Sequence, residues 1–301
     1  MKKAIVLVGI PGSGKSTYGK TLKLPYFSSD MIRLELFKTL KAHHDPEDDQ
    51  RVFTRLHELV FSFGDSLIYD ATNIDRKKRI FLYKEFKQRG YYVEVHLILE
   101  PKALALFQNK RRDPERVVPD FVVKDMYRGM MPPKIGVDTD DFKIISQSNF
   151  LSEPITLDTF VDYLKSNGTY KTIRRFINAA YLPEILKLED DMDVFAHTDK
   201  MISKSKSLEL LLASFFHDLG KGTTKLNKFK LHEQVSSMYA FRFFNEIKNI
   251  PPSLRVCDII DVILHHTNYP NIKPEILENQ KLDSNVLSLL EQFNLLNQES
   301  H

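Results

Sequence analysis

The sequence contains a single cysteine, Cys257, among 301 residues, which excludes an intrachain disulfide. Proteins of reducing compartments lack disulfides, so we expect a cytoplasmic protein. We interpret Cys257 as a small buried apolar residue between Val256 and Ile259. The near absence of cysteine therefore leaves packing and bound groups as the stabilising features of the chain.

Long apolar runs are also absent. Lys2 and Lys3 precede only five apolar residues, 4–8, before the first glycine, which is too short for the core of a secretory signal. No stretch approaches the roughly 20 apolar residues of a membrane-spanning helix. Both absences favour a cytoplasmic protein without a membrane partner.

The chain has little net charge, +3 in total, but its two halves differ. Residues 1–150 hold 26 Lys and Arg against 20 Asp and Glu, whereas the remainder holds 17 against 20. The first half is therefore at +6 and the second at −3. A basic first half suits a polyphosphate or nucleic acid partner.

The apolar pattern changes along the chain. Short apolar runs at 4–8, 66–70, 91–99 and 142–146 alternate with helical patterns, which predicts an α/β domain with a parallel sheet flanked by helices. From residue 157 the spacing is almost wholly helical, which predicts an all-α second domain. We place the first domain at 1–150 and the second at 151–301, with a join at 147–156 and a turn at 167–168.

A phosphate-binding motif follows the first predicted strand. Residues 9–17 read GIPGSGKST, which fits G-x4-G-K-[ST] between a strand and a helix. Gly12 and Gly14 let the loop turn its backbone N–H groups toward phosphates at the positive end of a helix. Lys15 would reach the β- and γ-phosphates of ATP, and Ser16, with Thr17 behind it, would hold Mg²⁺. The motif predicts ATP and Mg²⁺ as donor and cofactor.

The acceptor residues must come from elsewhere, and Asp30 with Arg33 are the candidates. The carboxylate of Asp30 could accept the proton of an attacking hydroxyl while Arg33 binds a phosphate of the acceptor. The same spacing fits a helix cap at Asp30 and a solvated Arg33 equally well. Asp70 ends a predicted strand and could order the Mg²⁺ water shell, or serve as a turn residue.

Three arginines lie within the stretch 109–116, NKRRDPER. Such a run is usually a solvated helix face, but in a P-loop kinase it suits a lid that neutralises the charge of the triphosphate. We assign Arg112 as the main clamp and Arg116 as a second contact.

The order GIPGSGKST, SSDMIR, DATN, NKRR and VVP resembles the phage-type polynucleotide 5′-kinases over about residues 1–145. The resemblance implies ATP-dependent phosphorylation of 5′-hydroxyl ends of RNA or DNA, and a phage origin with action in the host cytoplasm. It implies that Lys15 and Ser16 bind the donor, Asp30 is the general base, and Arg33 holds the phosphate beside the attacked end. Asp70 and Asn73 would support the site, and Arg112 would be the lid arginine.

The second half carries a histidine series. The series lies on or at the ends of the predicted helices and consists of His197, the pair His217–Asp218, His232 and the pair His265–His266. An adjacent His–Asp pair with an upstream His is a mixed N/O ligand set that suits a divalent transition metal such as Mn, Ni, Co or Zn. A metal there would acidify water and neutralise a phosphate, and Lys221 could bind a phosphate oxygen.

The segments LPEIL, VFAHT, LLASFFHDLGKGTT and KLHEQVSS resemble the HD phosphohydrolase superfamily, in detail the HD domain of bacterial CCA-adding enzymes. The resemblance covers about residues 170–270. It implies a metal-dependent 2′,3′-cyclic phosphodiesterase or phosphatase, with His197, His217 and Asp218 as ligands and His232 and His265 as auxiliary ligands or phosphate contacts. The family closes its ligand set with a late aspartate. Here Asn294 lies near that place, and Asp283 is the only Asp after His266.

Together the halves predict a bifunctional enzyme that heals nucleic acid ends, as in tRNA repair, for a downstream ligase. Asp218 would be essential for hydrolysis, and Lys15, Asp30, Arg33 and Arg112 for the kinase. One alternative keeps the P-loop but phosphorylates a nucleoside, a modified base or another small acceptor, with the HD half clearing nucleotides. In another, the HD half only binds nucleic acid. The sequence does not distinguish RNA from DNA, and it leaves the oligomeric state open.

Overall fold

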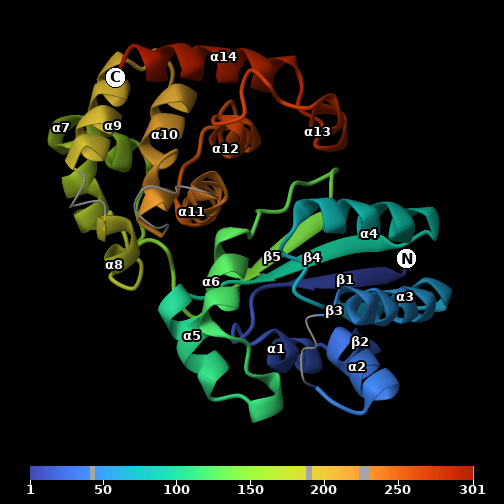
Figure 1. Ribbon diagram of the computed structural model, residues 1–301. Helices are drawn as coiled ribbons and strands as arrows, with labels where there is room; N and C mark the ends of the chain where they lie inside the picture. The colour runs from blue at the N-terminus through green and yellow to red at the C-terminus, as the bar shows by residue number, and fades with distance from the viewer. Residues whose placement is uncertain (41–44, 188–191, 224–230, 301) are drawn as a thin grey trace. The chain divides into compact units, whose positions relative to one another are not determined.

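The computed structural model describes residues 1–40, 45–187, 192–223 and 231–300. The chain forms two compact units, drawn in Figure 1. The first takes Met1–Tyr127 and Pro133–Gln147, and the second takes Arg128–Pro132 and the chain from Ser148 onward. Within the described ranges, none of the helices is at once long and apolar enough to cross a membrane.

The first unit is built on a five-stranded parallel sheet in the order β2-β3-β1-β4-β5. The strands are β1 (Lys3–Val8), β2 (Tyr26–Ser28), β3 (Leu67–Asp70), β4 (Tyr92–Ile98) and β5 (Asp141–Ile145). Both faces of β1, β3 and β4 are almost wholly buried, as expected for a parallel sheet covered by helices, and the buried side chains of β4 include Glu94 and His96 beside the apolar ones. This architecture confirms the α/β prediction, and four strands fall at the predicted apolar runs.

Helices connect the strands of this unit (Figure 1). They are α1 (Lys15–Thr21), α2 (Ser29–Phe37), α3 (Pro46–Ser62), α4 (Arg76–Gln88), α5 (Lys102–Lys110) and α6 (Asp120–Arg128), with a 3-10 turn at Pro114–Arg116. Side-chain oxygens cap several of them: Ser28 accepts from the backbone N–H of Met31, and Asp75 from that of Lys77. Because parallel strands end at one edge, the loops after β1, β2 and β3 meet there.

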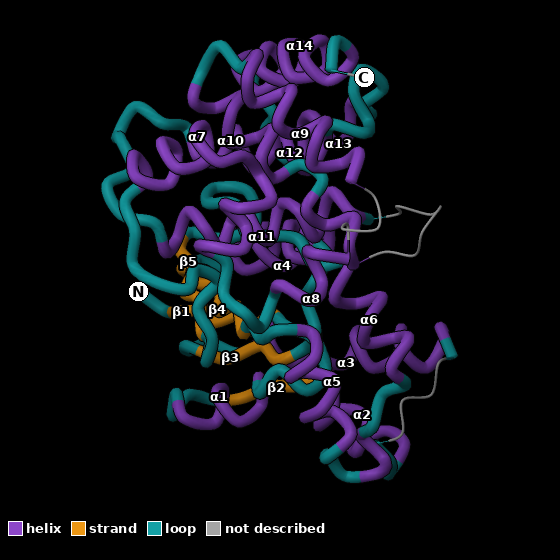
Figure 2. Tube along the Cα trace, turned by 90° about the vertical axis from the view of Figure 1, so that its left-hand side faces the viewer, coloured by secondary structure: helices purple, strands orange, loops and turns teal. Residues whose placement is uncertain are grey.

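The described part of the second unit is helical, and Figure 2 shows the strands confined to the first unit. Its helices are α7 (Leu157–Phe176), α8 (Leu182–Ile185), α9 (Met192–Lys204), α10 (Leu208–Phe216), α11 (His232–Glu246), α12 (Val256–His265), α13 (Pro274–Asn279) and α14 (Ser284–Gln298), with a 3-10 segment at Leu219–Thr223. The all-α prediction for this half is confirmed.

An aromatic core holds these helices together. The rings of Phe160 and Phe243 have centroids 4.6 Å apart, and Phe216 lies 5.0 Å from Phe243. The predicted turn at 167–168 lies inside α7 as a kink, where Gly168 takes φ 79°. Cys257 is exposed in the first turn of α12, so its predicted burial is wrong. The helix instead turns Ile259, Ile260, Val262 and Ile263 into the core.

A buried ion pair fixes the loop after β3. The Nε of Arg79 donates to Asp138 at 2.8 Å, and its Nη1 donates to the carbonyl oxygens of Asn73 at 2.8 Å and Ile74 at 3.0 Å. Both side chains of the pair are almost fully buried. Burial lowers the pKa of Arg79, and the charge of Asp138 acts against that shift. The pair therefore ties the edge loop to the segment before β5.

We expect Asp138→Ala to lower the free energy of unfolding by about 3 to 5 kcal/mol, because it leaves a buried guanidinium without its counter-charge. Urea unfolding followed by circular dichroism measures the loss. Lys87→Ala is the control, because Lys87 is exposed in its pair with Asp140, and its loss should change stability by less than about 1 kcal/mol. Equal losses in both variants would contradict the expectation.

Candidate active site and candidate metal centre

The phosphate loop runs from β1 into α1. Gly12 and Gly14 have φ of 82° and 90°, a left-handed conformation that favours glycine. A Cβ at Gly12 would lie 2.1 Å from the carbonyl oxygen of Ala105 on α5, so that helix also requires a glycine there. Gly14 is the N-cap residue of α1, which points the positive end of the helix at the loop.

Asp70, at the end of β3, joins the phosphate loop to β2 through two hydrogen bonds. Its Oδ2 accepts hydrogen bonds from Ser16 Oγ at 3.0 Å and from the hydroxyl of Tyr26 on β2. Burial raises the pKa of Tyr26, and the charge of Asp70 raises it further. Asp70 thus sits beside the hydroxyl predicted to hold Mg²⁺. Tyr26 was missed by sequence reasoning because only the pairing of β2 with β3 brings it there.

Lys15 is half-buried, and its Nζ donates to the carbonyl oxygen of Ile10 at 3.0 Å. Burial lowers the pKa of Lys15 to about 8; Asp70 acts against this shift, and Arg112 adds to it. Part of the Lys15 population therefore gives up its proton only slightly above neutral pH.

Two neighbouring cavities share Lys15, Ser16, Arg112 and Arg116 in their walls. One, of about 220 Å³, follows the phosphate loop and is also lined by Gly12, Gly14, Thr17 and Gln108. The other, of about 270 Å³, is lined by Asp30, Arg33, Asp49, Phe53, Asp70 and Lys78, among others. The candidate donor and acceptor residues thus line adjoining chambers.

The predicted lid arginines point in different directions. Arg112 and Arg116 line both cavities, whereas Arg111 lies over the ring of Phe107 at 5.2 Å. Burial lowers the pKa of Arg112, and the charge of Arg116 lowers it further. Arg116 Nη2 donates to Asp30 Oδ2 at 2.6 Å. The carboxylate that we predicted as general base is therefore in an ion pair with a lid residue.

The other acceptor candidate is also in an ion pair. Arg33 Nη2 donates to the carboxylate of Asp49 on α3. Asn73 does not line either cavity: its side-chain amide donates to the carbonyl oxygen of Leu7 at 2.8 Å, and it takes φ 48°. Asn73 thus supports the site by joining the ends of β1 and β3. Asp49 and Glu115, which accepts from the backbone N–H of Leu40 at 3.2 Å, were not predicted.

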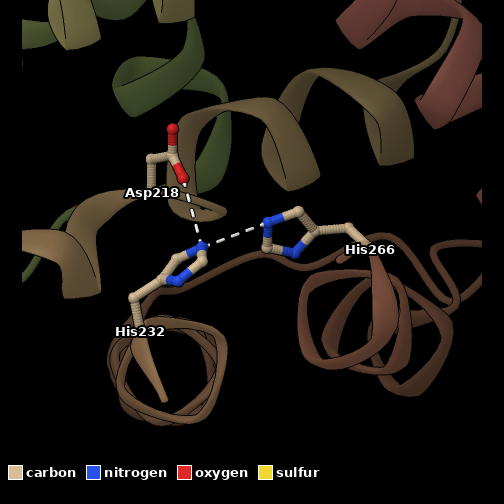
Figure 3. A group of neighbouring side chains, drawn as sticks. All are labelled: Asp218, His232 and His266. Carbon is tan, nitrogen blue, oxygen red and sulfur yellow. Dashed lines mark hydrogen bonds and ion pairs between the residues drawn. The ribbon is translucent and has the colours of Figure 1, made fainter. Parts of the chain in front are cut away.

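In the second unit, Asp218, His232 and His266 bring one ligand atom each to within 4.8 Å of one another (Figure 3). His232 Nε2 lies 3.3 Å from His266 Nε2 and 3.4 Å from Asp218 Oδ1. Nitrogen ligands about 2.0–2.1 Å from one ion lie roughly 3.0–3.4 Å apart. The spacing and the mixed N/O set therefore fit a divalent transition metal.

The opposite nitrogens of the histidines are anchored. Nδ1 of His217 and of His266 lie 2.8 and 2.7 Å from the carbonyl oxygens of Ser214 and Ile263, and Nδ1 of His232 lies 3.2 Å from Glu233. A proton on Nδ1 would leave the lone pair of Nε2 directed toward a metal. Burial lowers the pKa of His266 to about 3, and the neighbouring His217 lowers it further, so its ring is neutral.

Asp218 carries the negative charge of this group. Burial acts to raise its pKa, but His217, His232 and Lys221 together hold the pKa well below its usual range. Its Oδ2 lies 3.1 Å from His217 Nε2 and accepts a 2.6 Å hydrogen bond from Lys221. Lys221, predicted to bind a phosphate oxygen, is therefore in contact with the carboxylate itself.

Three predicted ligands, His197, His217 and His265, lie outside the group of three, although His217 Nε2 lies 3.1 Å from Asp218 Oδ2. His265 is directed to Gln280 Oε1 at 3.3 Å, and its neighbour His266 takes the place in the cluster. His197 lies beside His217, with ring centroids 5.8 Å apart, and its Nε2 lies 2.8 Å from Asn297 Oδ1. Asn297, rather than Asn294, is the asparagine of α14 that contacts this series, and Phe293 of the same helix packs against His217 and His266 with ring centroids 5.4 and 5.9 Å apart. Asp283 caps α14 and is paired with Arg255.

Two family models match the chain, one in each half. The family model of the AAA domain matches residues 5–133, and that of the HD domain matches residues 176–293. The chain therefore joins a kinase-like P-loop domain to an HD domain, a combination that supports nucleotide-related phosphoryl transfer and phosphohydrolysis.

Among solved structures, one similar chain is a protein of Chloroflexus aurantiacus J-10-fl that is described as a presumed kinase. It is 13% identical, and the alignment covers 55% of this chain and 97% of that chain with a TM-score of 0.39.

We expect the affinity for ATP to be constant below pH 8 and to fall above it, by at most about tenfold per pH unit. The bound phosphates favour the charged form of Lys15, and its pKa of about 8 means that protons must be taken up on binding at higher pH. Calorimetry with a non-hydrolysable ATP analogue at pH 7, 8 and 9 measures the slope. Lys15→Arg, which stays charged, should abolish it; an equal slope in both proteins would contradict the expectation.

We expect Asn297→Asp to tighten Mn²⁺ binding about tenfold or more, because it places a second carboxylate beside His197. Asn294→Asp is the matched control: it adds the same charge to the same helix one turn earlier. Calorimetric titration with Mn²⁺ gives both affinities without any assay of activity. Equal tightening in both variants would show that charge alone, not the place beside His197, is responsible.

Proposed function

We propose that this protein is a bifunctional nucleic acid end-healing enzyme, and that its P-loop half phosphorylates 5′-hydroxyl ends with ATP. The observation that carries this proposal is the pair of adjoining cavities that share Lys15 and Ser16. One follows the phosphate loop, and the other holds a carboxylate and an arginine for an acceptor, Asp30 and Arg33. A donor and an acceptor bound there would meet at Lys15.

In the proposed reaction, the oxygen of the 5′-hydroxyl bonds to the γ-phosphorus of ATP while Asp30 accepts the hydroxyl proton. The bond between the γ-phosphorus and the oxygen that it shares with the β-phosphate breaks, and ADP is released. Lys15, Arg112 and Arg116 offset the charge of the triphosphate. Ser16 and Asp70 would hold Mg²⁺, which supplies charge neutralisation between the β- and γ-phosphates. Arg33 would bind the acceptor phosphate next to the attacked end.

We propose that the HD half removes a 2′,3′-cyclic or terminal phosphate. The donor set of Asp218, His232 and His266, in which the ring of His266 is neutral and His217 lies alongside, supports a metal-dependent hydrolase. A divalent metal there would lower the pKa of bound water and neutralise phosphate charge. Cleaved tRNA carries both kinds of end, so the two activities together suit RNA repair before a ligase.

One observation favours a second candidate, a small phosphate-free acceptor. The guanidinium of Arg33 is already paired with Asp49, which offsets the charge that an acceptor phosphate would need. The two candidates make opposite predictions for Arg33. Arg33→Ala should lower kcat/KM strongly for an acceptor with a phosphate next to the attacked hydroxyl, and hardly at all for a nucleoside.

We expect an RNA oligonucleotide with a 5′-hydroxyl and a 2′,3′-cyclic phosphate to be processed at both ends by separate sites. In an assay with Mg²⁺, Mn²⁺ and γ-labelled ATP, Lys15→Ala should lose only label transfer and Asp218→Ala only the removal of the 3′ phosphate. Arg33→Ala should reduce transfer to this RNA by about 10²-fold or more, because a charge-assisted phosphate contact is lost.

The outcomes separate the candidates. Transfer to nucleosides but not to RNA, unaffected by Arg33→Ala, would sink the end-healing proposal for the first unit. Label transfer without any 3′ processing in the presence of Mn²⁺, Ni²⁺, Co²⁺ or Zn²⁺ would instead limit the HD half to binding nucleic acid.

A further inference from the structure

A stripe of aromatic side chains runs from the acceptor cavity along α3 and α4. We define the aromatic stripe as Phe53, His57 and Phe61 of α3, one turn apart, together with Phe81 of α4. The ring of His57 lies 6.2 Å from Phe53, 5.2 Å from Phe61 and 5.5 Å from Phe81, and Phe61 lies 6.4 Å from Phe81. The two helices are labelled beside the sheet in Figure 1. Four rings therefore form one continuous series.

The stripe begins inside the acceptor cavity, because Phe53 and Lys78 both line it. Its other members do not line that cavity. The three rings on α3 are half-buried, but Phe81 is 48% exposed. Packing between helices accounts for the buried faces of the α3 rings, whereas it leaves half of Phe81 in water. The stripe is therefore open to a ligand that already occupies the cavity.

Basic residues accompany the stripe. Lys78 Nζ lies 6.0 Å from the ring centre of Phe53, and Arg89 Cζ lies 4.7 Å from that of Phe61. Lys77 and Lys84 are exposed on the same helix, α4. Glu85 is paired with Arg89 at 2.8 Å, which offsets part of this charge. Exposed rings next to cations are the elements by which proteins bind single-stranded nucleic acid, through base stacking and phosphate contacts.

We propose that the aromatic stripe binds the bases of a single-stranded acceptor on the 3′ side of the phosphorylated end. The inference rests on the proposed function, since it places the 5′-hydroxyl at Asp30 and leads the strand out past Phe53. A nucleoside 3′-phosphate fills only the cavity, whereas a longer strand also reaches Phe81. The stripe thus makes the enzyme prefer oligonucleotides over mononucleotides without reading their sequence.

The experiment compares two acceptors, a nucleoside 3′-monophosphate and an octaribonucleotide with a 5′-hydroxyl. Wild type should show a lower KM for the octamer. Phe81→Ala should raise the octamer KM about tenfold, the effect typical of losing one base–aromatic stack, with kcat retained. The KM of the mononucleotide should stay the same, because its single base does not reach Phe81. Phe81→Tyr, which keeps a ring, should restore the octamer KM.

Phe121→Ala is the matched control, because Phe121 is a 68% exposed phenylalanine on α6 that is not part of the stripe and lines neither cavity. It should leave both KM values unchanged. Binding of a 3′-labelled octamer, followed by fluorescence anisotropy without ATP, should show the same tenfold loss in Phe81→Ala only. Melting temperatures of all variants should agree, since both exposed phenylalanines add little to the core.

The failures are distinguishable. If wild type phosphorylates the octamer and Phe81→Ala does so with the same KM, or if both acceptors lose equally, the stripe proposal is overturned and the kinase proposal stands. If wild type phosphorylates neither acceptor, the proposed function itself fails and the stripe proposal falls with it.

Discussion

The parallel pairing of β1 with β3 on one side and β4 on the other is the constraint on which the first unit depends. It sets Leu7 opposite Asp70, so that the phosphate loop begins beside the carboxylate that bonds Ser16. Pairing of β2 with β3 then sets Ser28 opposite Asp70 and starts α2 at the same edge. One sheet edge thus gathers the phosphate loop, Asp30 and Asp70 from three separate segments, because parallel strands end on the same side.

Much of this unit could be predicted, because its signals are local. The phosphate loop is contiguous in sequence, and buried parallel strands read as short apolar runs. The partners of its charged groups could not be predicted, since Tyr26–Asp70, Arg33–Asp49 and Arg116–Asp30 join residues 16 to 86 positions apart. No periodicity or spacing encodes such pairs. They arise only when helices of different connections pack at one edge.

The residues that face the candidate metal centre were harder to predict from the sequence. Successive residues of a helix point about 100° apart, so the choice between His265 and His266 depends on which face of α12 packs toward Asp218 and His232, and the sequence does not set that rotation. The same holds for Asn294 and Asn297, one turn apart on α14. Glu233 lies 3.2 Å from Nδ1 of His232 but was not predicted. The sequence does not show which side chains a histidine ring contacts, even when the partner is the next residue.

Both sites carry internal ion pairs that a substrate must rearrange. Asp30 is paired with Arg116, Arg33 with Asp49, and Asp218 with Lys221. Arg116 lines both cavities of the first unit, so one guanidinium serves either Asp30 or a triphosphate in the neighbouring chamber. In the proposed reaction, a triphosphate that draws Arg116 away leaves the carboxylate of Asp30 free to accept the hydroxyl proton. Asp30 is then available to the acceptor when the donor is present, which links the two chambers through a single side chain.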